Sequence, residues 1–205
     1  VLTEETSWLA GVDVATRSIV GTAHLDTASV PGLHDSWSEP GASRGEGLLL
    51  LRDGHVLVAK EKKPAGLVEL GPRGDSALGV SSTTLLGPDE PFALLGEVLD
   101  ALAWWPLEGA AARALHDLSD LAVDEHGDVW LLSDQSTCLA RLELPLVPDE
   151  VLGIADVLDL PGAVDKPEGL CFLPGGVVAV AEDHKGDGAN LWLLVRRAGH
   201  VVEPA

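Results

Sequence analysis

The sequence has little that would support a disulfide framework, a zinc site or a membrane span. Its 205 residues include only two cysteines, Cys138 and Cys171, with no CxxC pair and no Cys/His cluster. Two thiols allow one disulfide at most, so neither a disulfide-stapled fold nor a structural zinc site is indicated. No run of twenty apolar residues occurs, and no membrane-spanning helix is predicted.

Basic residues are also scarce. The chain has 13 Lys and Arg against 33 Asp and Glu, which gives a formal net charge of −20. Such a chain repels phosphate, so nucleic acid and anionic membranes are disfavoured as partners. Metal ions and cationic ligands remain possible partners. An ordinary solvated surface also explains much of the negative charge. No motif for a nucleotide or an organic cofactor is present, and no G-x-S-x-G motif.

What the sequence does contain is a repeat. The stretches "GEGLLLLRDGHVLVAKEKKP" (45–64), "DLSDLAVDEHGDVWLLSDQS" (117–136) and "KPEGLCFLPGGVVAVAEDHKG" (166–186) align without gaps. Each has a polar head, an apolar segment, a Gly turn, a second apolar segment and an acidic end. The equivalent leucines are Leu48, Leu121 and Leu170, and the equivalent glycines are Gly54, Gly127 and Gly176. The pattern predicts β-hairpins that are buried on both faces and stack on one another.

Acidic residues recur at two points of this repeat. Seven residues after the turn glycines come Glu61, Asp134 and Asp183. Two residues before the leucines come Glu46, Ser119 and Glu168. Glu182 precedes Asp183 directly, which leaves the register of the last copy open. A partial copy, "VLTEETSWLAGVD", aligns Glu4 with Glu61, so the first residues are expected to end an inner strand whose hairpin partner is absent.

The segment after each acid alternates apolar and polar residues, which predicts an outer strand. The distance in sequence from Ser119 to Glu168 is about that of one four-stranded propeller blade, roughly 40–50 residues. We therefore expect an all-β chain, and a β-propeller rather than a sandwich, because a sandwich does not explain recurring acids. About four blades or part-blades are visible. Residues 1–205 are expected to form a single propeller domain, N-terminally incomplete. Part of 87–111 can form a helix after the Pro, but Trp104 to Pro106 are predicted to belong to a strand of the next blade.

The ordered strings "EGL…KEK-P", "SDL…LSD-S" and "EGL…E" resemble successive blades of the SdiA-regulated propeller family, which neighbours the phytase-like esterases. The resemblance covers roughly residues 45–195 and implies six blades around an acidic axial channel in which calcium can bind. By this resemblance, six residues lie at motif positions of the family: Glu46, Glu61, Ser119, Asp120, Asp134 and Glu168. The string "LSDLAVDEHGDVWLLSD" is also similar to gluconolactonase-like propellers, which open lactones with a bound divalent metal.

Equivalent acids of stacked blades should meet near the propeller axis, where oxygen ligands suit Ca²⁺ first and Mg²⁺ second. The candidate metal ligands are Glu46, Glu61, Asp134, Glu168 and Asp183. The candidate ligand-binding residues are Lys60, Asp120, Lys166 and Glu182. Two alternatives stay open at these positions: each acid braces its own blade, or the lysines neutralise the acids without metal.

The predicted function is binding of a divalent cation, a small polar ligand or both, without catalysis. The alternative is a metal-dependent hydrolase of phosphoesters, esters or lactones. Catalytic residues, oligomeric state and localisation are not indicated by the sequence.

Overall fold

The computed structural model describes residues 1–3, 6–39, 42–183, 190–197 and 200–202, with side chains omitted for 197 and 200–202. Within these residues the chain is all-β, as predicted: it forms fifteen strands, two short helices, α1 (Pro31–Ser38) and α2 (Gly109–Ala114), and one 3₁₀ turn, η1 (Arg52–Gly54). Glu4, which the N-terminal partial copy aligns with Glu61, lies outside the described residues.

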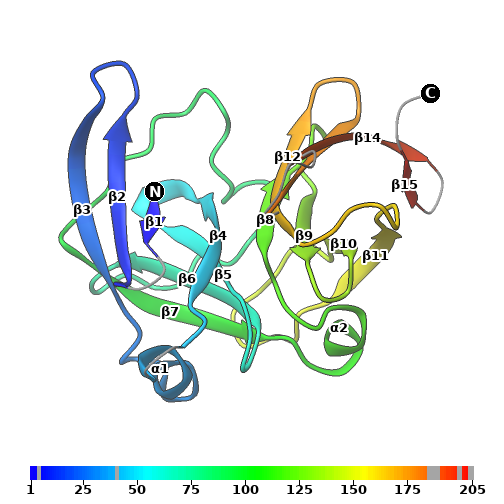
Figure 1. Ribbon diagram of the computed structural model, residues 1–205. Helices are drawn as coiled ribbons and strands as arrows, with labels where there is room; N and C mark the ends of the chain where they lie inside the picture. The colour runs from blue at the N-terminus through cyan, green and yellow to red at the C-terminus, as the bar shows by residue number, and fades with distance from the viewer. Residues whose placement is uncertain (4–5, 40–41, 184–189, 198–199, 203–205) are drawn as a thin grey trace. The chain divides into compact units, whose positions relative to one another are not determined.

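The chain divides into two compact units. The first comprises Val1–Pro106 with Pro145–Glu150, and the second comprises Leu107–Leu144 with Val151–Ala205. Each unit contains one sheet (Figure 1). No helix among the described residues is long and apolar enough to cross a bilayer.

The first unit has a seven-stranded sheet in the order β1-β2-β3-β7-β6-β5-β4. Its strands are β1 (Leu2–Thr3), β2 (Trp8–Asp13), β3 (Ser18–Asp26), β4 (Gly45–Leu50), β5 (Val56–Lys60), β6 (Gly66–Pro72) and β7 (Val98–Pro106). Strands β4 to β7 form an antiparallel meander, and β7 pairs in parallel with β3 at the outer edge. The sheet curls, so that β1 also lies against β4.

The second unit has an eight-stranded sheet in the order β12-β13-β14-β15-β11-β10-β9-β8. Its strands are β8 (Asp120–Val123), β9 (Val129–Ser133), β10 (Cys138–Leu142), β11 (Ile154–Asp159), β12 (Pro167–Leu173), β13 (Val177–Glu182), β14 (Leu191–Arg197) and β15 (His200–Val202). Two antiparallel meanders meet through the parallel pair β11–β15, and β8 lies against β12. Four-stranded meanders of this kind are typical of propeller blades.

The predicted equivalence of the three hairpins is confirmed by their register. The Cα partners are Leu48 with Val58, Leu121 with Leu131, and Leu170 with Val180. All three turn glycines have a positive φ, between 74° and 82°, which glycine adopts without a Cβ penalty. Leu121 and Leu170 are buried as expected, whereas Leu48 is only half-buried.

The inner hairpins supply much of each core. Every residue of β5 and of β9 is buried, which agrees with strands covered on both faces. In the first unit α1 adds Leu33 and Trp37 to a core that contains Val58 and Leu70. In the second unit Trp130 packs with Leu170 and Val180.

The prediction for Trp104 to Pro106 was right in type and wrong in position. These residues end β7, which is the outermost strand of the β4–β7 meander and not a strand of the next blade. Trp105 is buried, and its indole Nε1 donates to the carbonyl of Val147 at 2.9 Å. The side chain therefore secures the outer edge of its own meander.

Candidate functional site

The two bulged glutamates Glu46 and Glu168 lie at the same place in their hairpins. In β4, Gly45 pairs with Lys60 and Gly47 pairs with Ala59, so that Glu46 is an extra residue without a ladder partner. Glu168 is the corresponding extra residue in β12. A β-bulge bends the strand and re-aims a side chain, and bulges are frequent beside binding sites.

The hairpin of β8 and β9 has Ser119 where the other two hairpins have glutamate. Ser119 has a structural role. The Ser119 amide donates to the carbonyl of Leu132 at 2.9 Å, and its hydroxyl accepts from the Asp134 amide at 3.2 Å. Ser119 is buried. The serine therefore ties the two ends of its hairpin together.

The acids after the second strand also share one position. The Glu61 amide donates to the carbonyl of Arg44 at 3.0 Å, and the Asp183 amide donates to the carbonyl of Lys166 at 3.1 Å. This equivalence settles the register that the sequence leaves open: Asp183 corresponds to Glu61. Glu182, like Lys60, is the last residue of its strand.

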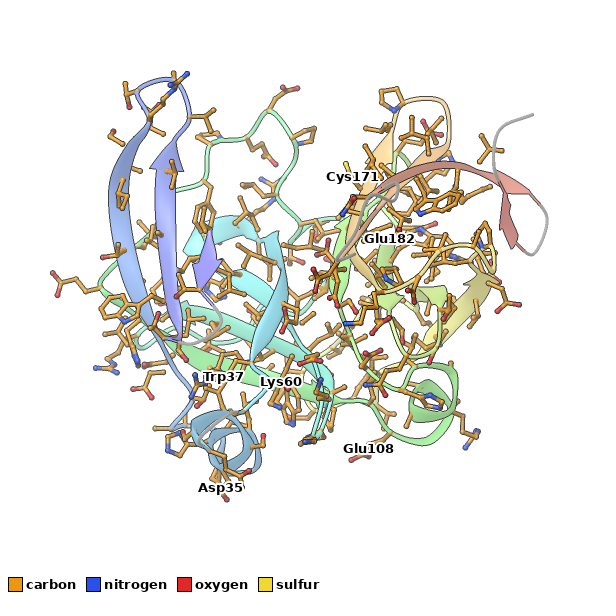
Figure 2. The ribbon with its side chains drawn as sticks, viewed as in Figure 1. Asp35, Trp37, Lys60, Glu108, Cys171 and Glu182 are labelled. Carbon is orange, nitrogen blue, oxygen red and sulfur yellow. The ribbon has the colours of Figure 1, made fainter. Side chains whose placement is uncertain are left out.

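Lys60 is fully buried at the end of β5 (Figure 2). Its Nζ donates to the carbonyls of Lys62 at 2.5 Å and Pro64 at 3.2 Å. Burial lowers the pKa of Lys60 from 10.5 to about 8, although the charges of Glu61 and Glu39 oppose the shift. The lysine thus fastens the loop after β5, while Glu61 forms an ion pair with Lys62.

In the second unit Asp120 joins two neighbouring inner strands. Its carboxylate accepts the amide of Leu170 in β12 at 2.7 Å and the amide of Leu121 at 2.8 Å. Burial raises the pKa of Asp120 above its ordinary value, and the two amide hydrogen bonds oppose the shift. This geometry is that of a brace between two different hairpins, whereas the first alternative has each acid brace its own blade.

Asp134 directly follows β9, and the other remaining predicted residues of the second unit lie around the start of β12 and the end of β13. Glu182 (Figure 2) accepts the Asp165 amide at 2.5 Å and thereby holds the segment that leads into β12. Lys166 and Glu168 are exposed, and Lys166 has a left-handed φ of 48°. Asp183 is also exposed, whereas Asp134 is half-buried.

The candidate metal ligands are divided between the units: Glu46 and Glu61 belong to the first, and Asp134, Glu168 and Asp183 belong to the second. Across the part of the chain that the structure describes, no group of three His, Cys, Asp or Glu side chains is arranged to hold a metal ion. The metal-binding and ligand-binding roles of these residues stay predictions.

The cysteines are both free thiols. Cys138 is buried, whereas Cys171 is exposed (Figure 2). Burial raises the pKa of Cys138 to about 11, and the charges of Asp159 and Asp117 act in the same direction. A thiol with so high a pKa is a poor nucleophile and belongs to the core.

Sequence reasoning did not identify a cavity of about 240 Å³ in the first unit. Side chains from the β1–β2 turn, the end of β3, helix α1 and the segment before β4 surround it. Its polar lining comprises Thr6, Ser7, His24, Asp26, Thr27, His34, Ser38 and Arg44. These residues come from four separate segments, and no repeat or short motif connects them in the sequence.

Comparisons with known proteins give a similarity to a solved structure. No protein-family model and no curated protein matches the chain. A crystal structure of a protein from Lactobacillus plantarum is similar over 100% of this chain and 50% of its own, with 14% identity and a TM-score of 0.47. The chain therefore spans about half the length of that protein.

Proposed function

We propose that this chain is part of a six-bladed β-propeller, similar to the SdiA-regulated family, that binds a divalent cation or a small polar ligand without catalysis. Calcium is the preferred ion and magnesium the second. In each unit the candidate site is the bulge of an inner strand, at Glu46 in the first unit and at Glu168 in the second.

One observation carries the proposal: a glutamate occupies the inner-strand bulge in two separate hairpins. A bulge leaves its residue outside the regular ladder, where the side chain can face a ligand. The other inner-strand position with a carboxylate, Asp120, is committed to two backbone amides. Asp120 is therefore assigned to the framework and not to the cation site.

Isothermal titration calorimetry of chelator-treated protein with calcium chloride and magnesium chloride tests the proposal. Glu46→Gln and Glu168→Gln keep the side-chain shape but remove the charge. Each should weaken calcium binding about tenfold or more. Glu125→Gln, at an exposed acid of the β8–β9 turn, is the matched control and should bind like the unmodified chain.

Absence of calcium binding, or an equal loss in Glu125→Gln, would reject the assignment of the site to the bulged glutamates. The hydrolase alternative is tested in the same preparation with para-nitrophenyl phosphate and a lactone. Calcium-dependent turnover that both glutamine variants lose would replace the binding function by the hydrolase.

A further inference from the structure

A cleft of about 480 Å³ opens on the first unit beside the exposed side chain of Trp8. Its lining comprises Trp8 on β2, Gly21 and Thr22 on β3, and Leu94, Gly96 and Glu97 from the segment that leads into β7. The volume lies within the roughly 300–1,000 Å³ of pockets that hold small ligands. One aromatic ring, one leucine and two polar side chains suit a ligand that has both apolar and polar surface.

Trp8 is held in place although it is exposed. Its amide donates to Thr3 Oγ1 at 3.1 Å, and the same hydroxyl donates to the Trp8 carbonyl at 3.0 Å. The His24 ring lies at 74° to the indole, with ring centroids 5.4 Å apart. Even so, 40% of Trp8 is exposed. An aromatic side chain that is both fixed and exposed can receive the apolar face of a ligand with little loss of side-chain entropy.

The polar groups of the cleft are Thr22 and Glu97, both exposed. The Glu97 carbonyl accepts the His24 amide at 2.9 Å, which fixes the backbone of Glu97 beside β3. Gly96 has a φ of 91°, which glycine adopts without a Cβ penalty. With the described residues, neither the Glu97 carboxylate nor the Thr22 hydroxyl forms a hydrogen bond or an ion pair. A ligand therefore meets a strong acceptor and a hydroxyl that both donates and accepts.

The single aromatic wall distinguishes two classes of ligand. A quaternary ammonium group is apolar on all sides and is typically enclosed by a cage of several aromatic rings. A sugar ring instead has C–H groups on its face and hydroxyl groups around its rim. One indole can cover that face, and the hydroxyl groups of the rim need both donors and acceptors. The lining of Trp8, Thr22 and Glu97 matches the sugar.

We propose that this cleft binds a sugar, whose ring stacks on Trp8 and whose hydroxyl groups bond with Thr22 and Glu97. The site goes beyond the proposed function, because it shares no residue with the bulges at Glu46 and Glu168 and requires no metal. Calcium binding can therefore fail while sugar binding succeeds, and the reverse.

Nuclear magnetic resonance of the full chain tests the site, with D-glucose, D-galactose and N-acetylglucosamine as probes and a chelator present. The Trp8 indole signal should shift saturably with at least one sugar, with a dissociation constant of about 10 mM or tighter. Trp8→Ala should weaken binding about tenfold or more, and Thr22→Val and Glu97→Gln about threefold each. Val12→Ala, on β2 outside the cleft lining, and Glu150→Gln, at an exposed acid of the same unit, are the matched controls.

The spectrum of each variant without sugar reports its folding. If Trp8→Ala does not fold, the variants of Thr22 and Glu97 carry the test. Saturable shifts that the cleft variants weaken and the controls leave intact support the site. Absence of saturable shifts with all three sugars, shifts that leave the Trp8 indole unaffected, or equal weakening in the controls overturns it. Choline chloride, added at matched ionic strength, is the competing probe: a saturable shift of Trp8 with choline and with none of the sugars overturns the sugar assignment in favour of an organic cation.

Discussion

The hairpin turn between β4 and β5 in the first unit and that between β8 and β9 in the second unit are each braced by a buried carboxylate. In the first unit this carboxylate is Glu69, on β6. It contacts His55 Nδ1 at 2.7 Å and accepts the amides of Leu78 at 2.7 Å and Gly79 at 2.9 Å. The turn is thereby fastened to the loop that follows β6.

The brace of the second unit is Asp124. It accepts the amides of His126 and Asp128 within its own turn, the indole of Trp130 at 3.0 Å and the guanidinium of Arg196 at 2.8 Å. Arg196 also lies over the Trp130 ring, 5.2 Å from its centroid. A cation–π contact thus adds to the ion pair.

The two braces differ in the cation that faces the carboxylate. Histidine changes its charge near neutral pH, whereas arginine stays charged throughout. The imidazole of His55 also needs a glycine beside it, because a Cβ at Gly71 would lie 2.6 Å from His55 Cε1. The same structural task is therefore performed by a pH-sensitive pair in one unit and by a pair without a titrating cation in the other.

The largest expected effect comes from removal of the carboxylates. Glu69→Ala leaves His55 and two amides without their acceptor, in a site where His55 and Glu69 are both almost fully buried. We expect a loss of about 3–5 kcal/mol in the free energy of unfolding. Asp124→Ala should cost less, about 2–3 kcal/mol, because Arg196 is partly exposed and can recover water.

Urea unfolding measures both losses, and hydrogen exchange assigns each to a unit. Glu69→Ala should accelerate exchange in β5 and β6, and Asp124→Ala in β8 and β9. A change of less than about 0.5 kcal/mol for Glu69→Ala would mean that this contact is not a brace.

The second prediction concerns pH. Burial by itself lowers the pKa of His55, but the hydrogen bond and charge of Glu69, with a smaller contribution from Asp75, outweigh burial and raise it above 6.5. The folded state then holds its proton more tightly than the unfolded state. The resulting stability is fully present below pH 6.5 and is lost as the pH rises through the raised pKa.

Asp124 behaves in the opposite sense. Burial tends to raise its pKa, but hydrogen bonds from His126, Trp130, Asp128 and Arg196 outweigh burial and lower it below 3.8. Its contribution is present above that value and is lost only as the pH falls through the lowered pKa. Between mildly acidic and mildly alkaline pH, the first brace should weaken while the second stays constant.

Urea midpoints of the unmodified chain and of His55→Asn, at about pH 5.5 and about pH 8, check this difference. The unmodified chain should lose more stability over this range than the variant. Subtracting the variant removes the contribution of Lys60, whose lowered pKa makes stability rise with pH above about 8. The same pH dependence in both proteins would contradict the role assigned to His55.

The hairpin register was predictable because it depends on local signals. A glycine that permits positive φ and a leucine six residues earlier locate the same pair of strands three times, and the observed pairings agree. The acids that follow could be aligned for the same reason. The contacts of the side chains around these acids could not be predicted. The hydrogen bonds of Lys60 to the loop and of Asp120 to the Leu170 amide depend on how the chain packs.

The braces and the cavity were missed because their partners are distant in sequence or lack a motif. His55 lies in the turn before β5 and Glu69 on β6, and Arg196 reaches Asp124 from β14. The cavity needs the approach of α1 to the end of β3, which follows from packing of Leu33 and Trp37. The one usable local signal was the "DEHGD" turn, in which an aspartate precedes a glycine and can accept its own turn amides.

The smallest expected effect tests how each unit joins its inner strands. In the first unit β1 lies against β4, and Leu2 occupies the space beside Gly45 that a side chain there would need. Gly47 of β4 occupies the position that corresponds to Asp120 of β8. Gly47 pairs with Ala59 and Asp120 pairs with Leu132, at the same point of the two hairpins. The first unit thus makes an apolar contact at Gly45, two residues before the position that corresponds to Asp120 in the second unit.

The variant Asp120→Asn distinguishes a structural role of Asp120 from a role in ligand binding. The asparagine oxygen can still accept the Leu170 amide, and the negative charge, which burial disfavours, is removed. The free energy of unfolding should therefore change by less than about 1 kcal/mol, whereas Asp120→Ala, which leaves that amide without a partner, should cost about 1–3 kcal/mol. Urea unfolding gives both values, and calorimetry with calcium chloride should find the affinity of Asp120→Asn unchanged. A tenfold weaker affinity in Asp120→Asn, with stability intact, would move Asp120 from the framework of the second unit into the binding site, because only the charge would have been lost.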